Sequence, residues 1–271
     1  MFRVRLVLIG VVSVALLGGF SRLRLKAVSG GTHPANDSAQ RTPVLVELFT
    51  SEGCSDCPPA DALLDRLDRS QPVSGVELIV LSEHVDYWND IGWRDPYSSH
   101  EYSQRQGAYA GHFGIGSVYT PQMVVDGYFE FVGSDERGAI QAIEGAAKTA
   151  KIPVSISSVH LEAGNAVTLH VEAGRLPSSS AAKSADVLIA TADESDESHV
   201  SRGENAGRTL KHIAVLRTLT RVGTVDQSGE FSQDVRIRTN RVNAGNLRVV
   251  AIVQEAPIGR VLGAGSARLS N

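Results

Sequence analysis

Short apolar runs alternate with helical patterns in the first half of the chain. Residues 44–49 form an apolar run that only Glu47 interrupts, as expected of a strand covered on both faces. Residues 60–67 carry leucines at helical spacing and follow two prolines, which a first helical turn tolerates. Residues 76–81 are apolar and β-branched and predict a second strand, parallel to the first because a helix connects them.

The next segments predict a helical insertion, a hairpin and a last helix. Residues 97–109 are polar and compatible with a helix, and residues 135–148 are rich in alanine. Between them, residues 122–132 predict two strands around an Asp126-Gly127 turn. Pro121 is placed at the start of the first of these strands, because proline cannot donate to a sheet ladder. Together these elements predict an α/β domain over residues 42–150.

Beyond residue 152 the pattern changes to short alternating strands. Residues 154–161 and 166–171 flank a Gly-Asn turn and predict a hairpin. Further runs of the same character cover residues 186–192, 209–221, 230–237, 247–254 and 259–269. This half predicts an antiparallel β-sandwich-like domain over residues 152–271. Its polar loop at 199–208 either faces the first domain or is a solvated hairpin.

The N-terminus has the pattern of an export signal. A basic start is followed by an apolar and small-residue run at 6–20 and by further basic residues up to Lys26. We expect a signal peptide or N-terminal anchor at 1–28 and a linker at 29–41. The protein is then periplasmic or secreted, either free or anchored to the inner membrane. A net charge of −4 gives no indication of nucleic-acid binding.

Cys54 and Cys57 are the only cysteines of the chain and stand between the first strand and the first helix. A C-x-x-C ring is so small that its loop-closure stabilisation is only about 2 kcal/mol, which favours a chemical role over a structural one. The order strand, turn, C-x-x-C, helix is the thioredoxin-like redox arrangement. A static disulfide is the alternative. Structural zinc needs four ligands, and without a second cysteine pair we expect no metal site and no cofactor.

The segment after the second strand is expected to lie beside the cysteines. In open α/β sheets, sites form beyond the carboxyl ends of parallel strands. This segment, residues 82–96, carries His84, Trp88 and Trp93. These side chains either face a substrate or pack a helical insertion.

Five stretches of the chain resemble one family. They are Val46 to Asp61, His84 to Trp88 with Gly92-Trp93, Tyr119 to Gln122, Gly203-Glu204-Asn205 with Gly207-Arg208, and Val253-Gln254. Together they are similar to the uncharacterised domain-of-unknown-function family 1223. The resemblance implies a secreted bacterial protein with a thioredoxin-like domain. It also implies that Pro121, after Thr120, is a cis-proline against an active-site disulfide.

The leading hypothesis is an exported thiol-disulfide oxidoreductase that acts on a protein or small-thiol partner. Cys54 is expected to be the more exposed cysteine and the nucleophile, and Cys57 to resolve the mixed disulfide. Glu47 is the candidate proton acceptor, and Pro121 is expected to present backbone to the substrate. The candidate substrate-binding residues are Thr120, His84, Trp88 and Trp93.

The sequence is also compatible with two other classes of protein. An exported C-x-x-C with His84 or His112 nearby suits copper(I), because soft thiolates select that ion, and the protein would then be a metal carrier. The third possibility is a non-enzymatic binding protein in which the β-rich half binds a partner and the cysteine domain is scaffold.

Overall fold

In a computed structural model, the chain is described over residues 41–162, 164–239 and 244–269. The predicted signal or anchor at 1–28, and the linker at 29–41 except for Arg41, lie outside the described residues. The described residues all belong to one compact unit. This unit contains both regions that the sequence predicts as separate domains, 42–150 and 152–271.

The elements follow the order that the hydrophobic pattern predicts, with longer strands in the second half. They are β1 (Thr42–Thr50), α1 (Pro58–Ser70), β2 (Val76–His84), α2 (His100–Phe113), β3 (Gln122–Val125), β4 (Phe129–Val132), α3 (Glu136–Ala146), β5 (Val154–Glu162), β6 (Ala166–Ala173), β7 (Ser184–His199), β8 (Thr209–Asp226), β9 (Phe231–Arg238), β10 (Leu247–Glu255) and β11 (Val261–Arg268), with a short 3₁₀ turn at Ala244–Asn246.

One eight-stranded sheet runs through both predicted regions, in the order β11-β10-β7-β8-β2-β1-β3-β4. The β1–β2 pair is parallel, as the connecting helix predicts, and β3 joins β1 antiparallel. The join between the two halves is a parallel contact of β2 with β8, where Ser82 lies opposite Val215. Strands from the C-terminal half therefore extend the N-terminal sheet instead of closing into a body of their own.

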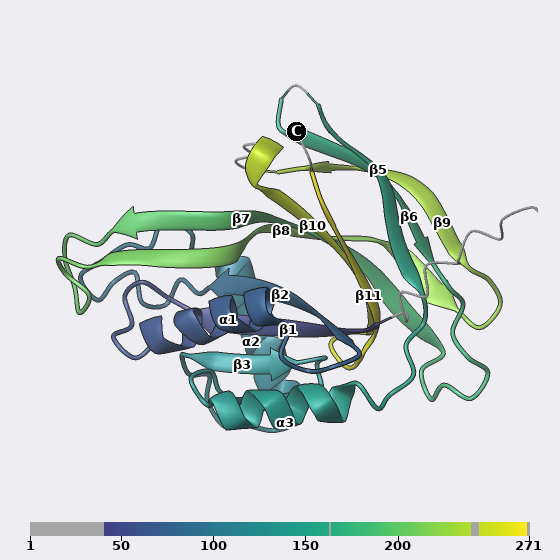
Figure 1. Cartoon of the computed structure of the whole chain (residues 1–271), viewed down its shortest axis with the longest axis horizontal. Coiled ribbons are helices and arrows are strands. Elements are labelled where there is room, and N and C mark those ends of the chain that lie inside the picture. Colours follow the sequence, from purple (N-terminus) through teal and green to yellow (C-terminus); the bar gives the residue numbers. More distant parts are fainter. Residues whose placement is uncertain (1–40, 163, 240–243, 270–271) are drawn as a thin grey trace, which may run out of the picture. The chain divides into compact units, whose positions relative to one another are not determined.

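A second sheet of three antiparallel strands, β5-β6-β9, covers part of the large one. Val167 and Val171 of β6 and Phe231 of β9 share a buried cluster with Val187 of β7 and Val249 of β10. The β5–β6 hairpin is confirmed. The chain thus has a mixed α/β fold with one large sheet and one small antiparallel sheet (Figure 1).

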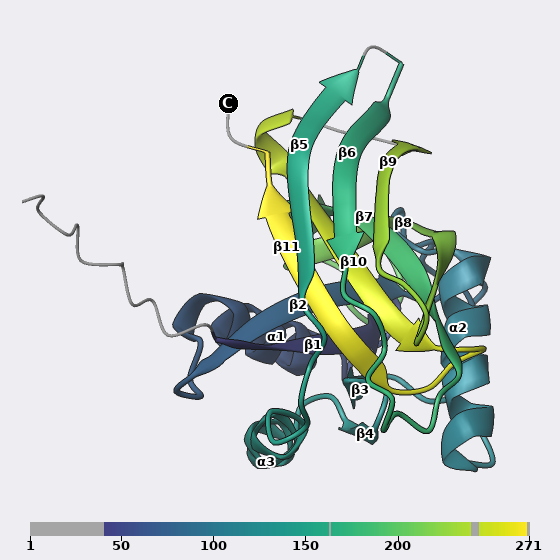
Figure 2. The same ribbon diagram turned by 90° about the vertical axis from the view of Figure 1, so that its right-hand side faces the viewer.

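Helices α1 and α3 lie on one face of the large sheet and α2 lies on the other (Figure 2). Val44, Val46 and Leu48 of β1 pack against α1 and α3. On the other face, Phe49 packs against Tyr109 of α2. Because successive side chains of a strand point to opposite faces, Glu47 points to the α2 face and away from α1.

The β7–β8 hairpin is long, and its turn at 200–208 lies beside the start of α1 (Figure 1). This contact brings the C-terminal half to the cysteine segment. Within the described part of the chain, none of the helices has the length and apolar character required to cross a membrane.

Candidate active site

Cys54 and Cys57 form a disulfide at the start of α1, with their Cα atoms 5.4 Å apart. Cys57 is the N-cap residue of α1, and Pro58 and Pro59 open the helix. Both cysteines are buried, with 1% of Cys54 and 0% of Cys57 exposed. Cys54, expected to be the more exposed cysteine, is thus almost as buried as Cys57, and the turn at 200–208 packs over the cysteine loop as a cover.

That cover is made by Asn205 and Glu204. The Asn205 side-chain amide donates to the carbonyl oxygens of Glu52 and Cys54, both at 2.9 Å. The Ser55 N–H donates to the Glu204 carboxylate at 3.0 Å. Asn205 is buried, so its two hydrogen bonds hold the β7–β8 turn against the cysteine loop.

Gly203 lets this turn approach closely. Its φ is +78°, a backbone conformation that residues with a side chain rarely adopt, and a Cβ there would lie 3.1 Å from Trp93 Cβ. The turn therefore seats against the segment that follows β2.

Trp88 links the cysteine loop to the Thr120–Pro121 segment. Its indole N–H donates to Thr120 Oγ1 at 2.8 Å. A Cβ on Gly53 would lie only 3.0 Å from Trp88 Cβ, so glycine is required for this packing. Trp88 thus fixes the distance between two parts of the predicted site.

Pro121 lies beside the first turn of α1. The Thr120–Pro121 peptide is cis, and Pro121 is buried. Gly133 packs against both segments, because a Cβ on it would be 3.1 Å from Pro121 Cβ and 3.2 Å from Ala60 Cβ. The structure therefore places the cis-proline next to the helix that carries Cys57.

A buried polar cluster lies behind the disulfide, with Asp95 at one side. Its carboxylate receives hydrogen bonds from the Glu52 and Tyr97 N–H groups, both at 2.8 Å, and lies 2.7 Å from His84 Nδ1. Burial opposes the charged form, but His84 and the two N–H groups outweigh it and lower the pKa of Asp95. Asp95 is thus a fixed anion of the cluster.

Glu52 is the second anchor of the cluster. Trp93 Nε1 donates to Glu52 Oε2 at 2.7 Å, and the Ser198 hydroxyl donates to Oε1. His212 Nε2, from β8, lies 3.2 Å from the same Oε1. Burial disfavours the His212 imidazolium, but Glu52 and Asp61 outweigh this effect and raise the pKa of His212.

Asp61, one turn after Cys57, completes the cluster. Its Oδ2 lies 3.8 Å from His212 Nδ1. Burial raises the pKa of Asp61, and His212 and His84 offset the rise only in part. The His84 and His212 rings lie 4.6 Å apart, so two imidazoles and three carboxyl groups share this space.

Buried polar atoms without a hydrogen-bond partner gather in this cluster. Among the residues that the structure describes, they include Asp61 Oδ1, His84 Nε2, His212 Nδ1 and Ser82 Oγ. Native structures leave few such atoms, so a group of them calls for an explanation such as a catalytic role or a bound water or ion.

Glu47 does not join the cysteines. Arg105 Nε donates to Glu47 Oε1 at 2.8 Å, and the Tyr109 hydroxyl donates to Oε2 at 2.6 Å. These partners lie on the α2 face, whereas Cys57 lies on the α1 face. The predicted proton acceptor is therefore engaged elsewhere.

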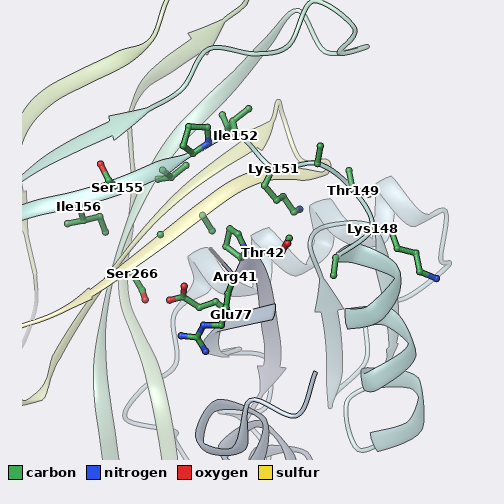
Figure 3. Close-up of a pocket in the computed structure, with 17 residues that line it drawn as sticks. Arg41, Thr42, Glu77, Lys148, Thr149, Lys151, Ile152, Ser155, Ile156 and Ser266 are labelled. Atoms are coloured by element: carbon green, nitrogen blue, oxygen red, sulfur yellow. The ribbon is translucent and has the colours of Figure 1, made fainter. Parts of the chain in front are cut away.

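His112, the other candidate copper ligand, is exposed near the end of α2. Within the described residues, no group of three or more His, Cys, Asp and Glu side chains is arranged to hold a metal ion. A groove of about 960 Å³, lined by Arg41, Glu77 and Lys148, lies at the opposite end of β1 from the cysteines (Figure 3). It does not adjoin the disulfide.

Seven of the eight predicted site residues lie together around the start of α1. They are Cys54, Cys57, Pro121, Thr120, His84, Trp88 and Trp93. Sequence reasoning missed Glu52, Asp61, Asp95, Asn205 and His212. For Asp61 a signal existed, because a residue four positions after Cys57 lies on the same helix face. His212 lies on a strand from the other half of the chain, and the sequence around it contains no signal that it belongs to this site.

Solved structures similar to this chain support the fold. A crystal structure of an Agrobacterium tumefaciens protein matches with a TM-score of 0.65 and 26% identity, covering 85% of this chain and 96% of that one. HBP35 of Porphyromonas gingivalis matches with a TM-score of 0.63 and 15% identity, covering 84% and 76%. At that identity the second likeness concerns the fold alone. No curated protein matches the chain.

The family comparison agrees with the motifs around the cysteines. Residues 45–254 match the family described as "Protein of unknown function (DUF1223)", a range that includes the disulfide, the cis-proline and the covering turn. The chain therefore belongs to the DUF1223 family.

Proposed function

We propose that the protein is an exported thiol-disulfide oxidoreductase on a thioredoxin-like scaffold, with Cys54 and Cys57 as its redox pair. The observation that carries this proposal is the position of the disulfide. It joins the only two cysteines of the chain, three positions apart, at the N-cap of a helix that follows a parallel strand. A disulfide that closes so small a loop constrains little of the fold, so its chemistry is the better explanation.

The surroundings support exchange chemistry. The N-terminus of α1 favours a thiolate on Cys57, because its helix dipole presents positive partial charge there. The cis Thr120–Pro121 peptide lies beside the same helix turn, where it can present backbone to an extended substrate. Asp56 stands between the two cysteines in the sequence, and the Glu204 carboxylate accepts from the Ser55 N–H; these negative charges oppose a strongly acidic thiol, which favours a reducing couple.

The closed cover defines what a partner must do. Cys54 is buried, so in this proposal the Asn205 hydrogen bonds to the cysteine loop open before a partner reaches it. We propose a protein or small-thiol partner that meets the pair in this open form, in the periplasm or outside the cell.

The test is a redox titration of the purified mature chain in glutathione and dithiothreitol buffers, followed by thiol labelling, with metal content measured on the same sample. We expect a reversible two-electron transition between roughly −120 and −270 mV. Cys54→Ser and Cys57→Ser should each abolish it, while Ser55→Ala, an exposed position between them, should keep it. A pair that stays oxidised below about −300 mV is structural, and a chain purified with stoichiometric copper is a carrier.

A further inference from the structure

Asp61 is the ionisable group that α1 places next to Cys57. The Asp61 N–H donates to the Cys57 carbonyl oxygen at 3.1 Å, as expected one helical turn apart. Side chains four residues apart share a helix face and lean towards the N-terminus. The Asp61 carboxyl group therefore lies over the turn that carries Cys57, and both residues are buried.

Asp61 and His212 both have unused hydrogen-bonding capacity. Asp61 Oδ1 and His212 Nδ1 have no partner among the described residues, and Nδ1 lies 3.8 Å from Asp61 Oδ2. Glu52 occupies the other ring nitrogen of His212 and so orients Nδ1 towards Asp61. At 3.8 Å the two atoms lie just beyond hydrogen-bond distance, so a small closer approach brings the carboxyl group and the imidazole to proton-transfer distance.

A cleft of about 690 Å³ between α1 and the β7–β8 hairpin reaches this pair. Its lining includes Pro58, Asp61 and His212. The Asn205 turn packs over the cysteine loop, where Asn205 donates to the Cys54 carbonyl oxygen. Solvent therefore approaches the buried Cys57 side through the cleft even while the cover is closed.

We propose that Asp61 and His212 form the proton relay of Cys57, and that the cleft between α1 and the β7–β8 hairpin connects this relay with solvent. The inference rests on the proposed redox function and names the proton path that the function needs.

The chemistry balances in both directions. When the disulfide is reduced, a thiolate of a dithiol substrate attacks Cys54 Sγ, the S–S bond breaks, and the electron pair stays on Cys57 Sγ. The Asp61 carboxylic acid then gives its proton to that thiolate. The second substrate thiolate attacks the mixed disulfide, which releases Cys54 as a thiolate and the substrate as its disulfide. In the reverse direction Asp61 accepts the proton of Cys57, and His212 passes it towards the cleft.

The charges around Asp61 suit this role. The groups that face it are His212 from β8, His84 from β2, Thr50 from β1 and Asp95 from the segment after β2. Burial raises the pKa of Asp61, so this carboxyl keeps its proton at a higher pH than an exposed aspartate. The charged side chains that line the outer cleft are Asp65, Arg69, Asp196, Glu197, Arg208 and Lys211.

The kinetic test compares Asp61→Asn with the matched control Asp65→Asn, one turn further along α1 and also at the cleft. The rate constant for reduction of the disulfide by dithiothreitol is followed between about pH 5 and pH 9. Asp61→Asn should slow reduction by about a hundredfold and remove one inflection from the pH profile. His212→Gln should slow it by about tenfold and shift that inflection. Asp65→Asn should stay within about twofold of wild type.

The same Asp61, His212 and Asp65 variants are also measured in an Asn205→Ala background. This background loosens the turn over the cysteine loop, so slow opening of that turn cannot mask the effect of Asp61 on the rate of reduction. A second readout at equilibrium uses Cys54→Ser, which leaves Cys57 as the single thiol, and measures its pKa from the pH dependence of alkylation. Asp61→Asn should lower that pKa, because it removes a nearby carboxylate that opposes the thiolate. A purely structural role for Asp61 would not combine a lower thiol pKa with slower reduction.

The outcomes separate the two proposals. If Asp61→Asn and Asp65→Asn give the same rates, pH profiles and thiol pKa while the wild type exchanges normally, the relay is wrong and the redox function stands. If dithiothreitol fails to reduce the disulfide at any pH, even with Asn205→Ala, the proposed redox function itself is wrong.

Discussion

Two buried polar clusters lie on opposite faces of the same strands, and they place different basic side chains beside their carboxyl groups. On the α2 face, Arg105 lies between Glu47 and Glu83. On the α1 face, His84 and His212 lie among carboxyl groups. Glu83 and His84 are neighbours in β2, and only strand alternation sends them to different faces.

Because one cluster contains an arginine and the other contains histidines, only the histidine cluster can change its charge near neutral pH, and the arginine cluster is a structural anchor. The pKa of Arg105 is raised because Glu47, Tyr109 and Glu83 together outweigh its burial, so this side chain stays charged at every pH of interest. A histidine can lose or gain its proton near neutral pH. The Arg105 cluster can therefore hold α2 on the sheet, whereas the histidine cluster can exchange protons beside the disulfide.

The largest effect that this comparison predicts follows from Arg105→Met. It leaves the buried Glu47 and Glu83 carboxyl groups without their cation and should lower the free energy of unfolding by about 3–5 kcal/mol. Burial and Glu47 already raise the pKa of Glu83, so its folded form binds a proton more tightly than the unfolded chain. Without Arg105 that pKa rises further, so the loss should grow as pH rises through the wild-type folded value of Glu83, which lies well above the ordinary 4.5. Urea unfolding at several pH values measures it.

The matched control is Arg66→Met, because Arg66 pairs with Glu136 at the surface, with 55% and 64% of the two side chains exposed. That substitution should change the free energy of unfolding by less than about 1 kcal/mol. An Arg105→Met protein as stable as this control would show that the α2 cluster contributes nothing as an anchor.

A smaller, pH-dependent effect is expected for His212→Gln. The pKa of His212 is raised in the folded state, so its stabilisation is complete below the ordinary value of 6.5 and is lost as pH rises through the folded value. The substitution should cost about 1–3 kcal/mol at pH 6, where it removes a buried charged partner of Glu52, and less at pH 9.

Urea unfolding at the two pH values measures the difference, with the exposed His199→Gln as control. A loss that is equal at both pH values would mean that His212 does not titrate in the folded protein.

The sequence predicted the local structure well because its signals are local. The apolar run at 44–49, the prolines before α1 and the Asp126-Gly127 turn each depend on a few neighbouring residues. The same holds for the cysteine pair and the Thr120–Pro121 segment, which the fold brings to one end of α1.

The parts that failed depend on long-range pairing or on strand faces. The parallel contact of Ser82 with Val215 joins the two halves and brings His212 to the site, and no periodicity within either half encodes it. Glu47 is a candidate proton acceptor because it lies on the strand that leads to the cysteines, but β1 is buried on both faces, so its apolar pattern does not reveal the alternation that turns Glu47 towards α2.

A further effect concerns the cover. Asn205→Ala removes two hydrogen bonds from the cysteine loop, each worth about 1 kcal/mol. We expect a modest decrease in the free energy of unfolding. We also expect faster reduction of the disulfide by dithiothreitol, because a loss of about 1 kcal/mol makes local opening roughly fivefold more favourable. Arg202→Ala, an exposed position of the same turn, should leave the rate unchanged. Equal rates in the two variants would mean that the turn does not limit access to Cys54.

The smallest effect is expected for Glu204→Gln, which separates the charge of the cover from its hydrogen bonds. Glu204 is exposed, and the hydrogen bond from Ser55 lowers its pKa, so the carboxylate is charged at neutral pH. Glutamine keeps an oxygen that can accept from Ser55, so the turn should stay closed. Removing one negative charge near Cys54 should speed attack by anionic glutathione by less than about threefold at low salt, and the gain should vanish at high salt. A gain of the same size with a neutral thiol would instead mean that Glu204 acts by holding the cover, as Asn205 does.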